Sequence, residues 1–472
     1  MPAQTAHCMK IKFGISSTLV LFLIIHASTI YAQQQIKNSS KPNIIFILTD
    51  DQRWDALGIA GNTIIKTPHI DELGSKGVLF KNAYVTTAIC CTSRASILSG
   101  QYMSRHKIDD FEKPFSDSAI QQTYPLLLRK AGYITGFIGK FGVGATLPDA
   151  GLFDYWNGSR AFDQQYYLTD GKGNSIHNTD SINHSITAFL NQYGKEKPFC
   201  LSVSFKAPHE LDGNPPTYPV QQKFKSLYAN DTIREPLTAN PKYWKSFPDF
   251  FRTDKNISRV RWKPLFSTNE LYQQTVKNYY RLISGVDEVV GKMMYQLKNM
   301  GIDKNTIIIF MGDNGFCLGE HGLEGKWYGY EECIRVPLIV YDPRPYSKYH
   351  GIKNADIALN VDIAPTILAF AGIKIPGSMQ GENLIDILDQ KTRERNDFFY
   401  EHTFLGSPQL PKTEGVVSKK MKYIIYTEHN YEELYDLAKD PDETNNLAQD
   451  SAYKTTMLQL RRRYKQLKEM VK

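Results

Sequence analysis

The chain has 472 residues, of which 42% are hydrophobic and 22% are charged, and its formal net charge is +7. This composition excludes an intrinsically disordered chain, and the length allows one large domain with a smaller one. The positive charge suits a polyanionic substrate, and an ordinary basic surface is the alternative. We expect no nucleic-acid partner, because no compact run of Lys and Arg with interleaved aromatic residues is present.

The N-terminus has the pattern of a secretory signal peptide. Two lysines precede a short apolar run over residues 14–25, and a polar stretch follows Ala32. We expect residues 1–32 to be a signal peptide and residues 33–41 to be a linker. The alternative is an uncleaved membrane anchor, for which the apolar run is short. No later segment has the length and apolarity of a membrane helix, so we expect an exported protein, periplasmic or secreted, without membrane insertion after cleavage.

Strands and helices alternate over residues 42–392. The apolar runs that we predict as strands are 43–48, 133–138, 199–205, 306–311 and 336–341. Amphipathic patterns over 269–300 and 362–371 predict helices, each followed by a glycine. Alternation of this kind predicts an α/β fold with a mostly parallel central sheet flanked by helices.

Two other kinds of segment complete the chain. Residues 148–180 and 211–266 are rich in Gly, Pro, Asn, Asp and aromatic residues, and we expect irregular insertions there that shape a pocket. Over residues 393–472, short strand patterns precede a final helix at 452–471. This part predicts a small C-terminal α+β subdomain with a short antiparallel sheet.

Polar side chains stand at the ends of four predicted strands. They are Asp50 with Asp51, Lys140, His209, and Asp313 with Asn314. In open α/β sheets, ligands bind at the carboxyl ends of strands. A single acid at a strand end is commonly a helix N-cap. Three carboxylates together repel one another and need a cation, and an all-oxygen ligand set favours Ca²⁺ or Mg²⁺ over zinc.

The segment Cys90–Arg94 reads Cys-Cys-Thr-Ser-Arg. Residues 92–99 indicate a helix ended by Gly100, so Cys90 lies at a helix N-terminus, where negative charge is favoured. A thiolate there is one candidate nucleophile. A thiolate beside three carboxylates and a hard cation is electrostatically unfavourable, however, and an oxygen nucleophile fits better.

These motifs resemble type I, formylglycine-dependent sulfatases of the alkaline phosphatase superfamily, whose signature Cys-x-(Pro/Ala)-x-Arg corresponds to Cys90–Arg94. The resemblance covers nearly the whole chain after the linker. Its matching segments are 42–53, 82–84, 139–140, 208–209, 312–315, 318–322 with Lys326, 335–338 and 433–437. Residues 42–392 would then form the sulfatase catalytic domain, with an alkaline-phosphatase-like fold.

The resemblance also implies cofactors and roles. A maturation enzyme would convert Cys90 to formylglycine (3-oxoalanine), whose hydrate supplies the nucleophilic oxygen. The implied ligands of Ca²⁺, or less favourably Mg²⁺, are Asp50, Asp51, Asp313, Asn314 and the modified Cys90. The implied catalytic residues are Cys90, Arg94, Lys140, His209 and Lys326. Arg94 would orient the formylglycine, the lysines would offset the sulfate charge, and His209 or Lys326 would protonate the leaving alcohol.

Two positions depart from the family pattern. Thr92 stands where Pro or Ala is usual, which bears on recognition by the maturation enzyme. Gly142 stands where the family often has a histidine that deprotonates the formylglycine hydroxyl. By residue type His321 is a candidate replacement, and a structural role for His321 is the alternative.

Several residues near these motifs are candidates for contacts with substrate. Arg53, Lys206, Glu210, His321 and Trp327 are candidates by position in the sequence. Tyr166, Tyr167, Trp156 and Trp244 in the insertions, and Glu401 and His402 near the C-terminus, are further candidates. Each has the alternative of a core or surface role. A disulfide among Cys200, Cys317 and Cys333 is left open by their spacing.

The sequence therefore predicts an exported, calcium-dependent sulfatase that hydrolyses sulfate monoesters. The aromatic insertions favour a sulfated carbohydrate, and we expect exo action on a glycan or oligosaccharide. One alternative is a phosphate or phosphonate ester hydrolase of the same superfamily. The other is a protein that binds sulfated glycans without cleaving them.

Overall fold

The computed structural model describes residues 41–163, 165–392, 394–404 and 410–472. The predicted signal peptide and residues 33–40 of the predicted linker lie outside the described residues. Contacts group Pro42–Lys472 into one unit, and the predicted boundary between residues 392 and 393 stays a prediction. In the described part of the chain, no helix combines the length and the apolarity needed to cross a membrane.

An eight-stranded sheet forms the centre of this unit, in the order β12-β2-β11-β8-β1-β7-β3-β4. Its strands are β1 (Asn43–Asp50), β2 (Val78–Tyr84), β3 (Ile134–Lys140), β4 (Tyr155–Ser159), β7 (Phe199–Pro208), β8 (Thr306–Gly312), β11 (Leu338–Tyr341) and β12 (Ile352–Leu359). Every pairing is parallel except the two that β11 makes with β2 and β8. The predicted α/β class with a mostly parallel sheet is confirmed.

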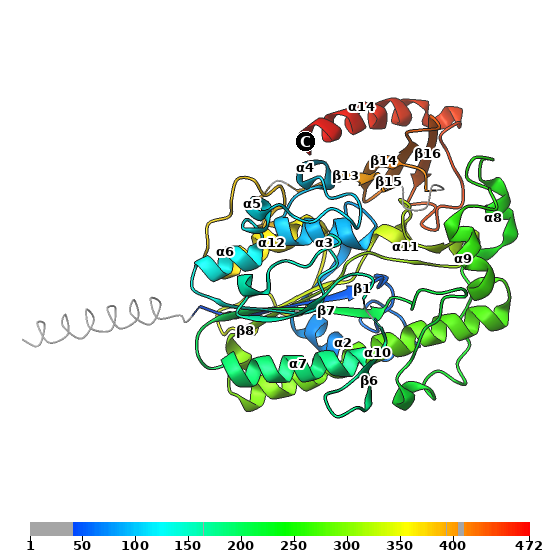
Figure 1. Ribbon diagram of the computed structural model, residues 1–472. Coiled ribbons are helices and arrows are strands. Elements are labelled where there is room, and N and C mark those ends of the chain that lie inside the picture. The colour runs from blue at the N-terminus through cyan, green and yellow to red at the C-terminus, as the bar shows by residue number, and fades with distance from the viewer. Residues whose placement is uncertain (1–40, 164, 393, 405–409) are drawn as a thin grey trace, which may run out of the picture. The chain divides into compact units, whose positions relative to one another are not determined.

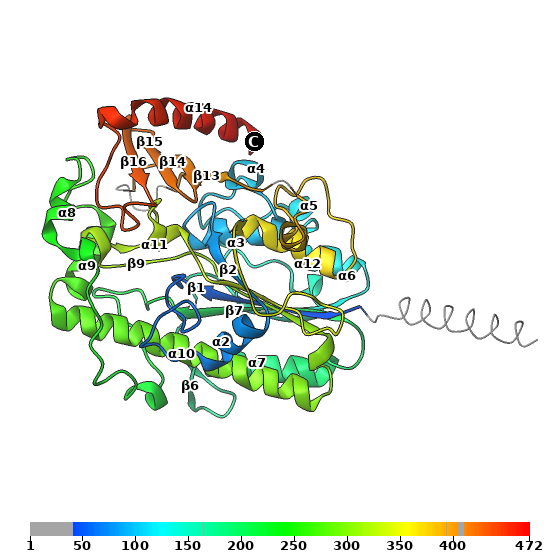
Figure 2. The ribbon, with the colours of Figure 1, turned by 180° about the vertical axis from the view of Figure 1, so that it is seen from behind.

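Helices cover both faces of the sheet (Figures 1 and 2). One layer contains α2 (Pro68–Lys76), α7 (Asn178–Tyr193) and α10 (Asn269–Asn299), and the other contains α3 (Cys90–Ser99), α6 (Tyr124–Lys130) and α12 (Ile363–Phe370). Strand β1 is buried along its whole length. Its side chains alternate between two cores, with Ile45 and Ile47 packed in one and Phe46 and Leu48 in the other. Burial on both faces explains why this strand is apolar throughout.

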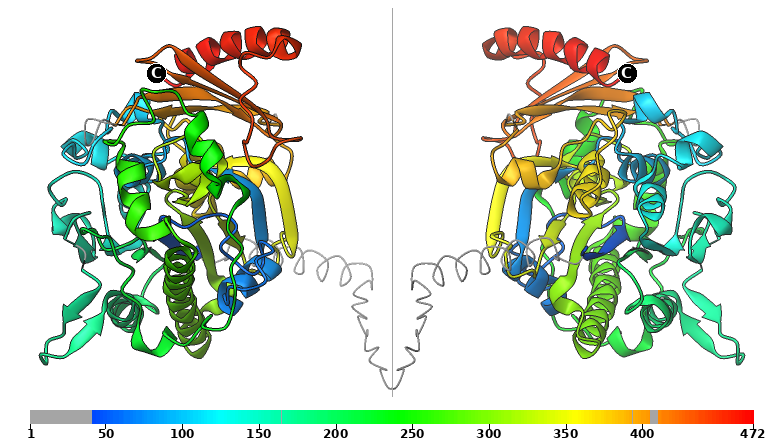
Figure 3. Two further views of the ribbon diagram at one scale, coloured as in Figure 1. Left: turned by 90° about the vertical axis from the view of Figure 1, so that its right-hand side faces the viewer. Right: turned by 90° about the vertical axis from the view of Figure 1, so that its left-hand side faces the viewer.

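The C-terminal residues form a second, antiparallel sheet in the order β13-β14-β15-β16 (Figure 3). Its strands are β13 (Asp397–His402), β14 (Thr413–Ser418), β15 (Met421–Tyr426) and β16 (Tyr431–Asp436). Helix α14 (Lys454–Met470) packs across β13 and β14. The predicted short antiparallel sheet and final helix are confirmed.

The two insertions contain more regular structure than we expected. Residues 148–180 include β4 and a hairpin of β5 (Tyr167–Thr169) and β6 (Ser175–His177). Residues 211–266 include α8 (Pro241–Ser246) and α9 (Ile257–Phe266). Asn240 and Asn256 cap these two helices with their side chains, so asparagines that suggested irregular loops in fact begin helices.

The remaining short elements connect the layers. They are α4 (Met103–His106), α5 (Asp117–Ile120), β9 (Cys317–Leu318), β10 (Glu324–Gly325), α11 (Glu331–Ile334), α13 (Leu384–Leu388) and the 3₁₀ turns Ala150–Leu152, Gln222–Phe224, Leu237–Ala239, Asp303–Asn305, Glu320–Gly322, Asn360–Asp362 and Ser451–Tyr453. Strands β9 and β10 pair antiparallel, and the segment between β9 and α11 carries Lys326.

Candidate active site

The four adjacent strands β8, β1, β7 and β3 run parallel, so their carboxyl ends lie along one edge of the sheet. The register pairs Thr49 with Gly312, and Gly139 with Ser204. The side chains at or just after these ends are Asp50, Asp51, Lys140, His209, Asp313 and Asn314, and all are at most 9% exposed. The structure therefore brings the polar groups of four separate segments into one buried site.

Asp51 is the geometric link between the two acidic strand ends. Its backbone N–H donates to Asp313 Oδ1 at 3.1 Å, and its carboxylate accepts a hydrogen bond from the Asn314 amide. Asp51 has a φ of 63°, a left-handed backbone that an aspartate tolerates at some cost. Tyr279 of α10 holds this turn by donating from its hydroxyl to the Asp51 carbonyl at 2.7 Å.

Cys90 is the first residue of α3, and Gly100 ends this helix in the left-handed conformation, as the sequence predicted. The Cys90 thiol is 1% exposed, and Lys326 Nζ lies 3.1 Å from its Sγ. One potential ligand atom each from Asp50, Asp51, Cys90 and His209 lies within 4.8 Å of the others. Burial raises the pKa of the Cys90 thiol, which disfavours a thiolate nucleophile here.

Three cations are paired with the three carboxylates. Arg94 Nε donates to Asp313 Oδ2 at 2.8 Å, Lys326 Nζ donates to Asp51 Oδ1 at 2.5 Å, and Lys140 forms a short ion pair with Asp50. Arg94 is fixed further because its Nη1 donates to the Lys140 carbonyl and to Ser204 Oγ, both at 2.5 Å. These groups form a dense, ordered array of charge from which water is largely excluded.

The carboxylates do not share one electrostatic environment. Burial disfavours the charged form of Asp50, but Lys140 and other nearby cations hold the pKa of its carboxyl well below its usual range. Burial raises the pKa of Asp51 well above its usual range, and burial together with the Asp50 charge raises the pKa of Asp313. Burial therefore opposes the ionised forms of Asp51 and Asp313, and a divalent cation beside them would favour those forms.

His209 is oriented by its own backbone surroundings. Its Nδ1 lies 2.6 Å from the Glu210 carbonyl, which can only accept, so Nδ1 carries the proton and Nε2 faces Asp51 Oδ2 at 3.4 Å. Burial lowers the pKa of His209, and Lys326 adds to this effect. The Tyr166 hydroxyl donates to the His209 carbonyl at 2.5 Å, so Tyr166 supports the histidine loop.

Three buried oxygens in the site accept no hydrogen bond from the described chain. They are Asp50 Oδ1, Asp51 Oδ2 and Asn314 Oδ1. Buried acceptors without a partner are costly, and a bound cation would give these oxygens a partner. The donor set therefore fits a hard divalent ion.

An ionic network that the sequence did not suggest borders the site. Arg261 of α9 forms a short ion pair with Glu210, and its Nε lies 3.0 Å from Glu324 Oε2. Glu210 follows His209 and Glu324 is two residues from Lys326, so Arg261 joins the segments of both candidate proton donors. Arg261 and Glu210 are 51 residues apart, and no local pattern could have revealed their contact.

Two of the predicted substrate residues are held in other surroundings. Arg53 pairs with Asp55 and Glu320 and lines a separate cavity of about 400 Å³. His321 stacks on Tyr330 with ring centroids 4.4 Å apart. Neither residue belongs to the cluster around Cys90, and this placement favours structural roles.

Lys206 and Trp327 lie closer to the cluster around Cys90. The Lys206 ammonium sits 5.6 Å from the Tyr166 ring centroid, and burial lowers its pKa. The Trp327 backbone N–H donates to the Ala88 carbonyl at 3.1 Å, two residues before Cys90. With Glu210, these residues remain candidates for substrate contacts.

Most of the aromatic candidates are engaged within the protein. Tyr166 is 1% exposed, Trp156 packs against Phe137 and Phe153, and Arg259 covers the Trp244 ring. Tyr167, at 50% exposed, is the aromatic candidate with a free face. Near the C-terminus, Glu401 accepts from the Ser104 N–H at 2.9 Å, and His402 is buried.

Gly142 is packed directly against the site. Its φ is +71°, and a Cβ there would lie 2.8 Å from Arg94 Cδ and 3.5 Å from Lys140 Cε. A side chain at this position would collide with Arg94 where it lies here, so the absence of a histidine matches the position of Arg94.

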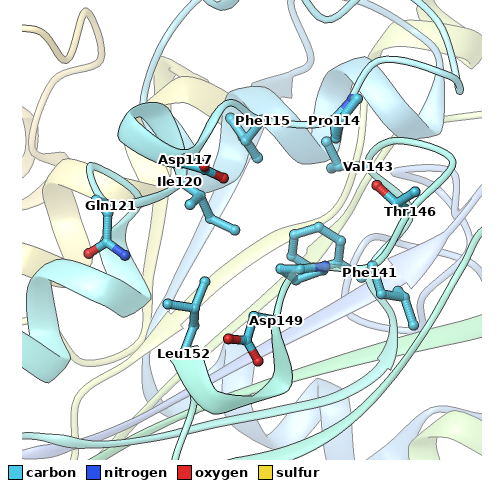
Figure 4. A pocket seen from close by; sticks show the side chains of 12 residues that line it. Pro114, Phe115, Asp117, Ile120, Gln121, Phe141, Val143, Thr146, Asp149 and Leu152 are labelled. Atoms are coloured by element: carbon cyan, nitrogen blue, oxygen red, sulfur yellow. The ribbon is translucent and has the colours of Figure 1, made fainter.

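A cavity of about 380 Å³ lies beside the loop that follows Lys140 (Figure 4). Phe141 and Val143, which flank Gly142, form part of its wall, and Asp117 and Asp149 face it. The described residues that line it include no basic side chain. It therefore does not suit a sulfate group, whereas the cation-rich cluster at the strand ends does.

Comparisons with known proteins agree with this geometry. The profile of the sulfatase family matches residues 42–373, and a profile described as N-sulphoglucosamine sulphohydrolase, C-terminal, matches residues 319–470. The chain is 29% identical to an N-acetylglucosamine-6-O-sulfatase of Bacteroides thetaiotaomicron over 93% of this chain and 88% of that protein. It is 30% identical to an arylsulfatase of Clostridium perfringens over 89% of this chain and 93% of that protein.

Solved structures of related proteins have a similar fold. One in complex with its substrate D-glucosamine-2-N,6-O-disulfate superposes with a TM-score of 0.74 and 26% identity, over 92% of this chain and 98% of that chain. A phosphonate monoester hydrolase of Agrobacterium radiobacter has a TM-score of 0.74 at 21% identity, over 91% of this chain and 96% of that chain. The second likeness shows a shared fold only.

Proposed function

Because the chain belongs to the sulfatase family of the alkaline phosphatase superfamily, a family of sulfuric ester hydrolases, we propose that it removes sulfate from a carbohydrate. The observation that carries this proposal is the buried cluster in which Arg94, Lys140 and Lys326 surround Cys90 and three carboxylates. The names of the relatives support a sulfated sugar, and 6-O-sulfated glucosamine is the first substrate to test. Exo action on a glycan or oligosaccharide is part of the proposal.

We propose Ca²⁺ as the cation, with Mg²⁺ as the alternative. Asp50, Asp51, Asp313 and Asn314 would hold it together with the modified Cys90, and the unpartnered buried oxygens of Asp50, Asp51 and Asn314 support three of these ligands. A bound divalent ion would draw charge from the sulfate oxygens and favour the ionised form of the nucleophile. Flexible ligation by carboxylates and an amide suits Ca²⁺.

Cys90 is the position at which formylglycine would be made. A sulfur nucleophile beside a hard cation is a poor match, and the formylglycine hydrate would instead supply an oxygen for attack on sulfur. The proposed partner for this step is a formylglycine-generating maturation enzyme. Arg94, held by Asp313, Lys140 and Ser204, keeps its guanidinium beside Cys90 at a fixed orientation.

The other residues hold the ester and move its proton. Lys140 and Lys326 offset charge on the sulfate oxygens, which grows in the transition state. His209 has its Nδ1 proton committed to the Glu210 carbonyl, so it can protonate the leaving alcohol only as the imidazolium, with the second proton on Nε2. Lys326, with its ammonium 3.1 Å from Cys90 Sγ, is the alternative donor.

The test compares sulfate, phosphate and phosphonate esters of one glycone. We expect sulfate release to exceed phosphate release at least tenfold and to depend on added Ca²⁺. Faster turnover of the phosphate or phosphonate ester would establish the alternative hydrolase activity, which the fold alone does not exclude. Mass analysis of the tryptic peptide Asn82–Arg94 from protein made in its native host tests the binding-only alternative, since unmodified Cys90 throughout would support it. Cell fractionation tests the proposed export to the periplasm or medium.

A further inference from the structure

Two buried cysteines from different segments lie side by side. Cys317 Sγ in β9 is 3.1 Å from Cys333 Sγ in α11, and both side chains are 0% exposed. Elements β9 and α11 lie next to each other (Figure 2). Neither thiol has a role in the proposed reaction.

The backbone holds these thiols together. The Gly315 N–H donates to the Cys333 carbonyl at 2.9 Å, and the Phe316 N–H donates to the Glu332 carbonyl at 2.6 Å. Cys317 itself pairs with Gly325 in the β9–β10 hairpin. Two sets of hydrogen bonds therefore align the cysteines, independently of any contact between the sulfurs.

We propose that Cys317 and Cys333 form a disulfide in the mature protein. A bond length of about 2.05 Å requires the sulfurs to approach by roughly 1 Å, which small side-chain rotations supply. The inference rests on the proposed export, because oxidising compartments preserve disulfides and the cytosol does not. Of the bridges that the sequence left open, the geometry points to this one, while Cys200 lies elsewhere, in β7.

The oxidant is the disulfide of a thiol–disulfide exchange protein in that compartment. One cysteine, as its thiolate, attacks an oxidant sulfur, so a mixed disulfide forms and one oxidant thiol leaves. The second cysteine attacks the mixed disulfide, the protein disulfide forms and the other oxidant thiol leaves. The cysteines lose two electrons and two protons, and the oxidant gains both. Because both thiols are fully buried, the exchange takes place before this segment finishes folding.

The bridge would close the segment that carries Lys326. Its ends are 16 residues apart, and Glu324, Lys326 and Trp327 lie between them. Closing this loop reduces the freedom of the unfolded chain. It also tethers Lys326 to the strand that follows Asp313 and Asn314.

The chain offers a direct chemical test. Trypsin cleaves after Lys326, so Cys317 and Cys333 fall in separate peptides, Asn305–Lys326 and Trp327–Arg335. Full-length protein exported to the periplasm is alkylated while denatured, digested without reductant and analysed by mass. We expect the two peptides as one linked species, about 2 Da lighter than their sum, and separate alkylated peptides after reduction. A Cys200→Ala variant should give the same linked species.

A second measurement compares the melting temperatures of the oxidised and the reduced forms of the same chain. Protein refolded in a glutathione redox buffer should melt about 3–6 °C higher than the same chain refolded with reductant. A Cys317→Ala/Cys333→Ala variant should show no difference between the two buffers. Recovery of both peptides as free thiols from exported and from oxidatively refolded protein, or linkage of either to Cys200, would overturn the proposal. The peptide masses do not depend on activity, so loss of the proposed sulfatase function would leave this test intact.

Discussion

Replacement of Gly142 by alanine tests how tightly the structure fixes Arg94. Gly142 has a φ of +71°, and the added Cβ would lie 2.8 Å from Arg94 Cδ. The guanidinium cannot move away cheaply, because Asp313, Lys140 and Ser204 all hold it. Alanine should therefore push the Arg94 side chain out of its place beside Cys90.

The matched control is Gly132→Ala. Gly132 has a φ of +89°, and a Cβ there would meet no heavy atom within 4 Å. A left-handed backbone destabilises alanine relative to glycine by about 1–2 kcal/mol. The lower conformational entropy of the unfolded chain with alanine offsets about 0.4–1 kcal/mol of this loss. Gly132→Ala should thus lose about 1 kcal/mol of unfolding free energy. Gly142→Ala should lose roughly 1–3 kcal/mol more, the typical cost of overpacking.

Two assays separate these effects. Urea unfolding measures stability, and sulfate release measures kcat, which should fall at least about tenfold for Gly142→Ala because the catalytic groups are displaced. Gly132→Ala should keep the wild-type kcat. Equal losses of stability in the two variants, with unchanged kcat in both, would show that Arg94 is not held as the structure describes.

Four further outcomes are expected. Cys90→Ala should abolish sulfate release with little change in melting temperature, and retained turnover would exclude a nucleophile at this position. Asp51→Asn should weaken Ca²⁺ binding at least tenfold by calorimetry, and unchanged affinity would remove Asp51 from the ligand set. Arg261→Gln should lower kcat about tenfold at unchanged Ca²⁺ affinity. Its control, Arg252→Gln at an exposed ion pair, should keep the wild-type kcat. An equal kcat in the two variants would show that Arg261 has only a structural role. Thr92→Pro should raise the fraction of modified chain without changing kcat per modified site, and an unchanged fraction would show that Thr92 does not limit maturation.

Local patterns were sufficient to predict the strands that build the site. The runs that became β1, β3, β7 and β8 are apolar because both faces of each strand are covered. The polar residues at the ends of these strands could be recognised in the sequence because each one interrupts an apolar run. The direction of β11 was not visible, because the apolarity of a strand reports its burial and carries no information about its orientation.

Contacts between distant segments had no local signal. The ion pair of Arg261 with Glu210 and the approach of Cys317 to Cys333 depend on how separate segments pack. The sequence also gave no reason why Gly142 replaces a histidine. The structure supplies one, because Arg94 occupies the space that a side chain at residue 142 would need.

Burial also bears on when the proposed conversion of Cys90 to formylglycine would take place. Cys90 is 1% exposed and Thr92 is 0% exposed, and both belong to the first turn of α3. An enzyme could reach this thiol only by unwinding that turn, which would separate Arg94 from Asp313 and leave a buried carboxylate unpaired. Conversion should therefore precede folding. Under this proposal, residue 92 would act on the accessible, unfolded segment and would affect how many chains are modified. Gly142 would act on the folded site and would affect the turnover of each modified chain.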